Sequence, residues 1–92
     1  MIKSFKHKGL RDFFVTGSVT GIQPAHAPKL RRMLSRLDQS SDPQDMGLPG
    51  YRLHQLVGQP KGMWSVTVNG NWRMTFYFEG TYATLVDYLD YH

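Results

Sequence analysis

Residues 63–79 read Met-Trp-Ser-Val-Thr-Val-Asn-Gly-Asn-Trp-Arg-Met-Thr-Phe-Tyr-Phe-Glu, and this stretch decides the fold. Two runs rich in β-branched and aromatic residues flank Asn69-Gly70, a pattern typical of a β-hairpin. A two-residue loop would oppose Val66 and Arg73, mixing apolar with polar partners. A three-residue loop, Asn69-Gly70-Asn71, avoids this. It pairs Val68 with Trp72, Val66 with Met74, and Trp64 with Phe76.

This register gives the hairpin one apolar face and one polar face, because successive side chains of a strand alternate. The apolar face consists of Trp64, Val66, Val68, Trp72, Met74, Phe76 and Phe78. The polar face consists of Ser65, Thr67, Arg73, Thr75, Tyr77 and Glu79. We expect the first face to lie in the core and the second to present an arginine among hydroxyl groups.

The composition is that of one small folded domain covering residues 1–92. The chain is 40% hydrophobic and 13% aromatic, which suits a packed core. It contains no cysteine, which excludes a disulfide framework and a thiolate metal site. It has neither an apolar run of membrane-spanning length nor the apolar stretch of a signal peptide. We therefore expect a cytoplasmic protein without membrane contact.

Two amphipathic helices are predicted before the hairpin. The first covers Lys8 to Thr16 and stops at Gly17. The second carries apolar residues at i, i+3, i+4 and i+7. Its start is ambiguous: Pro24 suits a first turn, whereas Pro28 would interrupt a helix begun there, so we expect a kink or restart near Pro28. The apolar stripe consists of Leu30, Met33, Leu34 and Leu37.

The remaining segments complete an α+β domain. We expect a short first strand at residues 1–5, a loop at 39–50 with one helical turn after Asp42-Pro43, strand character at 51–56, and a central last strand at 82–91. Helices followed by strands predict two N-terminal helices packed on one face of a mostly antiparallel sheet. Arg73 would then lie on the uncovered face.

Positive charge is concentrated in the N-terminal part of the chain. The net charge is +4, but residues 1–37 hold eight of the eleven Lys and Arg and one acid, Asp12, a net charge of +7. This asymmetry suggests a polyanionic partner such as nucleic acid. On the second helix, Lys29, Arg32 and Arg36 form a basic stripe opposite the leucines. The stripe is either a solvated face or a surface that docks on RNA.

The residues offer one arrangement suited to catalysis. The four histidines are far apart in the sequence, so no metal motif or cofactor is indicated. Asp90-Tyr91-His92 and Arg73 remain: imidazole exchanges protons near neutral pH, and a guanidinium stabilises a developing phosphorane. These groups suffice for metal-free RNA cleavage by a 2′-hydroxyl. Alone, the pattern also fits a frayed C-terminal end and tyrosines that only pack.

Five motifs in order give the whole chain a resemblance to a known family. They are Lys-Ser-Phe-Lys-His-Lys-Gly-Leu at 3–10, Leu-His-x-Leu at 53–56, Trp-Ser-Val-x-Val-Asn at 64–69, Asn-Trp-Arg-Met-Thr-Phe at 71–76 and a final Asp-Tyr-His. The sequence resembles the HigB-type toxins of the RelE superfamily. The resemblance implies ribosome-dependent mRNA endonuclease activity, a HigA-type helix-turn-helix antitoxin, and operator DNA bound only through the toxin–antitoxin complex.

The resemblance also implies roles for individual residues. The transition-state arginine falls on Arg73, and the C-terminal catalytic residues fall on Asp90, Tyr91 and His92. The histidine in the strand before the hairpin falls on His54. The RNA-binding candidates are His54, Lys8, Lys29, Arg32, Arg36 and Lys61.

One position departs from the family pattern. Where the HigB-like motif runs His-x-Leu-Lys-Gly, this chain has Val57 in place of the lysine. Loss of a cation beside the scissile phosphate would weaken binding and charge stabilisation, although a neighbour such as Lys61 could substitute. The alternative functions are therefore a weak or inactive member that acts as an antitoxin-binding transcriptional co-regulator, and a stand-alone nucleic-acid-binding module.

Overall fold

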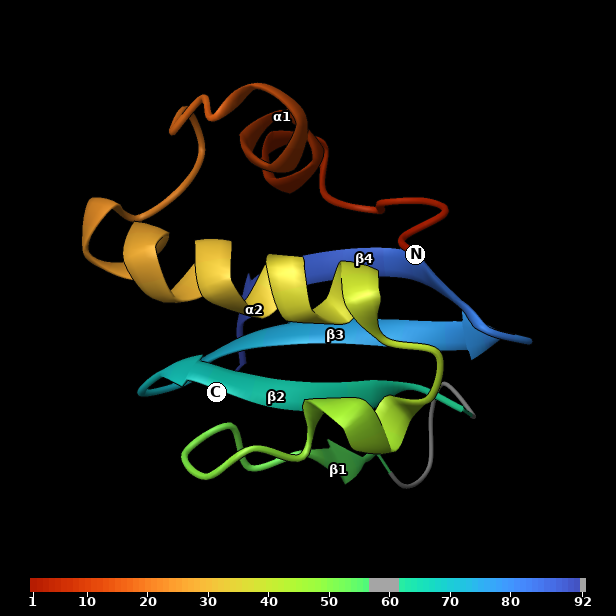
Figure 1. Ribbon diagram of the computed structural model, residues 1–92. Coiled ribbons are helices and arrows are strands. Elements are labelled where there is room, and N and C mark those ends of the chain that lie inside the picture. Colours follow the sequence, from red (N-terminus) through yellow and green to blue (C-terminus); the bar gives the residue numbers. More distant parts are fainter. Residues whose placement is uncertain (57–61, 92) are drawn as a thin grey trace.

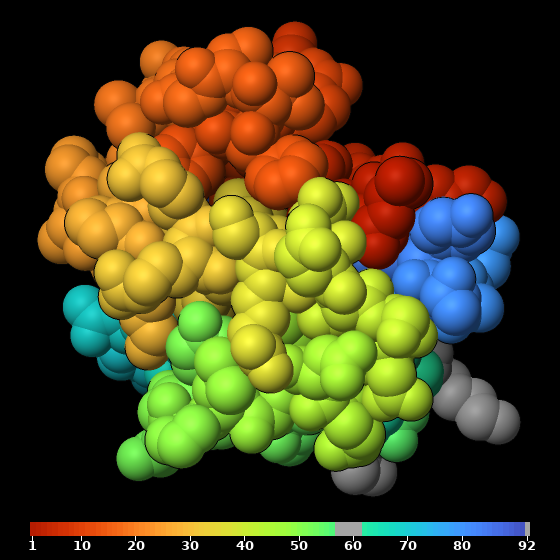
Figure 2. Space-filling view, in the orientation of Figure 1, coloured from red at the N-terminus to blue at the C-terminus, as the bar shows by residue number. Residues whose placement is uncertain are grey.

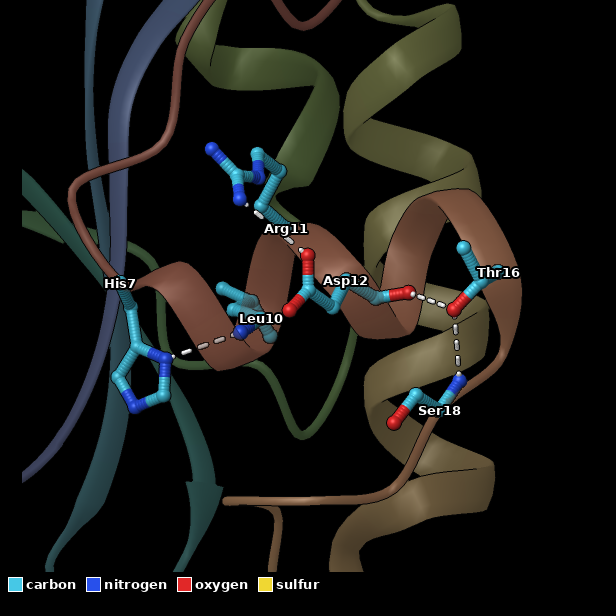
Figure 3. Close-up of polar contacts among 6 residues, drawn as sticks. All are labelled: His7, Leu10, Arg11, Asp12, Thr16 and Ser18. Carbon is cyan, nitrogen blue, oxygen red and sulfur yellow. Dashed lines mark hydrogen bonds and ion pairs between the residues drawn. The ribbon is translucent and has the colours of Figure 1, made fainter.

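The first helix begins and ends at residues whose side chains and backbone cap it. The computed structural model describes residues 1–56 and 62–91, and α1 spans Lys8–Thr16 as predicted. His7 is the N-cap: its Nδ1 accepts a hydrogen bond of 2.9 Å from the amide of Leu10 (Figure 3). Gly17 ends the helix with φ 82°, and its N–H donates to the carbonyl of Phe13.

The second helix restarts at the predicted proline. A 3₁₀ turn, η1 (Pro24–His26), precedes α2 (Ala27–Gln39), which has Pro28 in its first turn. The predicted turn after Asp42 is η2 (Pro43–Met46), and the Asp42 carboxylate caps it by accepting from the amide of Gln44. All four residues of the predicted apolar stripe of α2 are buried.

Within the described residues, four strands form an antiparallel sheet in the order β1-β2-β3-β4. They are β1 (His54–Gln55), β2 (Trp64–Asn69), β3 (Trp72–Glu79) and β4 (Tyr82–Asp90). The predicted first strand is reduced to two isolated parallel bridges, Ile2 to Ala83 and Phe5 to Val86. The prediction that the last strand is central is wrong, because β4 stands at the end of the strand order. β4 is an edge strand that the N-terminal segment flanks only as far as Val86.

The hairpin keeps the predicted faces but reaches them by a different turn. Trp64 lies opposite Phe76 and Val66 opposite Met74, as predicted. The predicted pairing of Val68 with Trp72 is wrong, because Asn69 pairs with Trp72 and the loop is the two residues Gly70 and Asn71. Val68 is the extra residue of a β-bulge. The bulge compensates for the short loop, so Val68 remains buried in the core.

A helical layer covers one face of this sheet. Figure 1 shows α2 running across the sheet, with α1 beside it and η2 near β1 and β2. From this side the helices and their connections hide most of the strands (Figure 2). The architecture is the predicted α+β arrangement. The core joins buried side chains of both layers: Leu10, Phe13, Ile22, Ala27, Leu30, Met33, Leu34, Leu37, Met46, Val66, Val68, Met74, Phe76, Ala83, Val86 and Tyr88.

The two predicted helices are short relative to a bilayer. Within residues 1–56 and 62–91, no helix has the length and apolar character needed to cross a membrane.

Candidate functional site

The face of the sheet opposite the helices carries a row of polar side chains. His54 of β1 pairs with Ser65 of β2, Ser65 pairs with Thr75 of β3, and Thr75 pairs with Asp87 of β4. Directly paired residues share a face, so these four side chains lie on one side. We call this side the open face. At its centre, Ser65 and Thr75 are small side chains that are only 1% exposed.

Arg73 lies on the open face in the adjacent row. It pairs with Thr67 on one side and Leu89 on the other. Its Nη1 donates to the carbonyl oxygens of Gly70 at 2.6 Å and Trp72 at 3.3 Å. Within the described part of the chain, Nε and Nη2 of Arg73 make no hydrogen bond. These two donors form the fork that binds a phosphate in a bidentate manner.

The C-terminal residues lie beside this arginine. Asp90 pairs with Trp72, the residue before Arg73, and so lies on the helix side of the strand. The amide of Tyr91 donates to the carbonyl of Asn71 at 2.8 Å, which extends the pairing by one residue. Alternation puts Tyr91, which is 46% exposed, on the side of Leu89 and Arg73. His92 lies outside the described residues.

His54 reaches the open face with one ring nitrogen already used. Nδ1 is 2.9 Å from the carbonyl oxygen of Arg52. A carbonyl oxygen only accepts, so Nδ1 carries the hydrogen and Nε2 of the neutral ring is the nitrogen that accepts a proton. His54 lies in the row of Thr75, two strands across and two residues along from Arg73, so the two main chains are about 12 Å apart. Two long side chains can meet one phosphodiester across this distance.

The basic candidates belong mostly to the other side of the molecule. Lys8 is in the first turn of α1, and Lys29, Arg32 and Arg36 are on α2. They belong to the helical layer, whereas Arg73 lies on the opposite face of the sheet. Val57 and Lys61 lie outside the described residues. The structure therefore unites only His54, Arg73 and Tyr91 among the described candidates, with Asp90 at the edge.

Two residues of the basic stripe are held against the helical layer. The ammonium of Lys29 lies 5.8 Å from the ring centre of Tyr51, and Nε of Arg36 donates to the carbonyl of Asp45 at 2.6 Å. Arg32 is exposed. A shallow depression of about 570 Å³ runs along this surface. It is lined by Arg31, Arg32, Ser35, Arg36 and Gln39.

Sequence patterns missed a cluster of four rings under the Arg73 end of the sheet. The rings of Trp72 and Tyr88 stack with centres 4.7 Å apart, and the rings of His7 and His26 each meet Tyr88 edge-on. Nδ1 of His26 and the hydroxyl of Tyr88 are hydrogen bonded at 2.6 Å. Burial raises the pKa of the Tyr88 phenol. The four residues are far apart in the sequence, so no spacing could reveal them.

In residues 1–56 and 62–91, no three His, Cys, Asp or Glu side chains gather as a set of metal ligands. The open face instead offers a guanidinium, an imidazole and a phenol, which are the groups that bind phosphate and move protons.

Comparison with known proteins identifies the family of this chain. Residues 3–92 match the model of a family described as the RelE-like toxin of the type II toxin–antitoxin system HigB. The endoribonuclease HigB of Proteus vulgaris is 39% identical over 92 residues, which is the full length of both chains. The chain therefore belongs to the HigB family of RelE-like toxins of type II toxin–antitoxin systems.

Proposed function

We propose that this toxin is an endoribonuclease that cleaves mRNA on the ribosome, with the open face as its active site. The observation that carries the proposal is the shared position of Arg73, His54 and Tyr91 on the open face. The similarity to an endoribonuclease over the full chain supports the same reaction class. In this reaction the 2′-oxygen of the RNA attacks the adjacent phosphorus, and the bond from phosphorus to the 5′-oxygen breaks.

Each protein group has a defined part in this step. A base takes the proton of the 2′-hydroxyl, and an acid gives a proton to the departing 5′-oxygen. His92 is suited to acid or base work, and Nε2 of His54 is a further base. Tyr91 orients the RNA or shares the proton transfer on the open face, and Asp90 does so from the strand end, because its side chain leaves the strand on the helix side. Nε and Nη2 of Arg73 stabilise the charge that develops on the phosphorane. The products are a 2′,3′-cyclic phosphate and a 5′-hydroxyl.

The partners follow from the family and from the charge. A toxin of a type II toxin–antitoxin system has an antitoxin that neutralises it. We propose a HigA-type antitoxin with a helix-turn-helix, through which the complex binds operator DNA. The ribosome is the polyanion that the basic helical layer fits, with Lys8, Lys29, Arg32 and Arg36 on ribosomal RNA and His54 and Lys61 toward the mRNA. This assigns the toxin to the cytoplasm, where translation occurs.

Val57 motivates the alternative, a weak nuclease that acts as a transcriptional co-regulator with its antitoxin. Primer extension on mRNA from cells that express the toxin separates the two. The proposal expects new 5′ ends within translated mRNA, and their absence from the same transcript with its start codon removed. A toxin that leaves translated mRNA intact while it still increases operator binding by the antitoxin would support the alternative.

A further inference from the structure

The ring cluster lies directly beneath the residues of the proposed active site. Trp72 pairs with Asp90 and precedes Arg73, and Tyr88 precedes Leu89 in the neighbouring strand. The stacked rings of Trp72 and Tyr88 therefore fix the main chains of both strands at the end where the open face carries Arg73 and Tyr91. Because side chains alternate, whatever holds these rings on the helix side also sets the backbone from which Arg73 leaves on the other side.

His26 holds Tyr88 from the helical layer. It is the last residue of η1, is 6% exposed, and lies edge-on to Trp72 with ring centres 5.5 Å apart. The Tyr88 oxygen accepts from the amide of Gln23 at 3.4 Å. Nδ1 of His26 lies 2.6 Å from the same oxygen, and the tautomer of the ring sets which of the two groups donates this hydrogen bond. In either direction, His26 gives a buried hydroxyl a hydrogen-bond partner in the helical layer.

The connection continues to the guanidinium. Arg73 is oriented by the carbonyl oxygens of Gly70 and Trp72, and both belong to the backbone that the Trp72 ring anchors. The amide of Tyr91 is held by the carbonyl of Asn71 in the same turn. A tilt of the Trp72 ring would therefore move Arg73 and Tyr91 together.

We propose that His26 is a positioning residue for RNA cleavage, acting through Tyr88 and Trp72 on Arg73 and Tyr91. It does not touch the RNA. Its hydrogen bond holds Tyr88, and Tyr88 holds the strand end in the geometry that the reaction needs. The inference rests on the proposed endoribonuclease function, and it names residues in the helical layer that no sequence motif pointed to.

Three variants test the hydrogen bond itself. Tyr88→Phe removes only the hydroxyl and keeps the stack on Trp72. His26→Leu removes the hydrogen-bonding nitrogen, whereas His26→Asn keeps an amide that can donate or accept near the position of Nδ1. Tyr88→Phe and His26→Leu should lower kcat by about ten- to a hundredfold with little change in KM, since misplacement of reacting groups affects the chemical step. His26→Asn should recover most of the loss.

Phe78→Leu is the matched control for lost stability. Phe78 packs against Phe76 in the same strand, about 20 Å from Trp72. At equal loss of thermal stability, Phe78→Leu should leave kcat per folded molecule unchanged. Wild-type kcat in folded Tyr88→Phe would overturn the proposal, and so would an equal loss in Phe78→Leu.

Hydrogen exchange gives a readout without activity. The Tyr91 amide, bound to the carbonyl of Asn71, should exchange about tenfold faster in Tyr88→Phe than in Phe78→Leu. Equal exchange in the two variants would contradict the positioning role. If the wild-type protein cleaves no RNA, the proposed function fails, while the exchange comparison still decides whether His26 and Tyr88 hold this strand end.

Discussion

Arg73 donates from Nη1 to the carbonyl oxygen of Gly70 at 2.6 Å, so the main chain of the hairpin turn orients its guanidinium. Neither of the two ion pairs recorded among the described residues involves Arg73. In the proposed reaction, the guanidinium would therefore be oriented before RNA binds, which is the condition for effective charge stabilisation.

Replacement of this arginine should abolish most of the cleavage. Arg73→Ala should lower kcat by about 10²–10³, the usual effect of removing one preorganised charge stabiliser. Arg73→Lys keeps the positive charge and loses the forked pair of N–H donors, so its activity should lie between that of the wild type and that of Arg73→Ala. The measurement is single-turnover cleavage of ribosome-bound mRNA, with circular dichroism to confirm folding. Equal activity of the lysine variant and the wild type would show that charge alone suffices.

Deletion of His92 tests the proton-transfer role. Cleavage should fall by about 10²–10⁴, the usual scale for a positioned acid or base. The residual products should still end in 2′,3′-cyclic phosphate and 5′-hydroxyl, because the RNA supplies its own nucleophile. Chelators should not inhibit the wild-type protein. Full activity in a folded deletion variant would remove His92 from the mechanism, and inhibition by chelators would refute a metal-free reaction.

The basic stripe of α2 should affect binding and leave the chemical step intact. Replacing Lys29, Arg32 and Arg36 together by Gln should weaken ribosome binding and reduce its dependence on salt, because fewer counterions are released from phosphates. The stripe lies across the molecule from Arg73, so kcat at saturating ribosome should not change. Lys3→Gln is a control, since Lys3 is exposed and pairs with Glu79. Unchanged ribosome affinity in the triple variant would make the stripe a solvated face.

Core truncations should rank by burial. Phe76 is fully buried, so Phe76→Ala should cost about 3–5 kcal/mol of unfolding free energy. The apolar hairpin pattern alone predicts the same range for Trp72→Ala. Trp72 is only partly buried, so its truncation should cost less than that of Phe76. Urea denaturation of both variants measures the order, and a larger loss for Trp72→Ala would show that the ring cluster contributes more than its burial indicates.

The buried phenol of Tyr88 makes stability depend on alkaline pH. Burial raises the pKa of Tyr88 above its ordinary value of 10.0, so the folded state favours the neutral form. The stability that the neutral Tyr88 phenol contributes is present in full below pH 10.0, and it is lost as the pH rises through the higher pKa of the folded state. Thermal unfolding measured from neutral pH upward through pH 10.0 follows this loss of stability. Tyr88→Phe should show a smaller decline, and an identical decline would assign it to other groups.

The sequence alone determined the elements that depend on near neighbours. Gly17 ends α1 because the chain there adopts φ 82°, a left-handed conformation that glycine reaches without the clash of a Cβ atom. Pro28 makes the second helix restart, because proline fits only the first turn. The stripe on α2 and the pairing of Val66 with Met74 follow from helical and strand periods that a few residues reveal. The motifs also identified the family, which the comparisons confirmed.

Only the tertiary structure decided the features that join distant segments. The hairpin has a bulge at Val68 in place of the predicted three-residue loop. Both arrangements bury Val68 in the core, so the apolar pattern alone could not distinguish them. The basic stripe came to lie opposite Arg73, since charge carries no information about which layer a helix covers. His26 and Tyr88 are 62 residues apart, and their hydrogen bond exists only because the helical layer and the sheet close over one core.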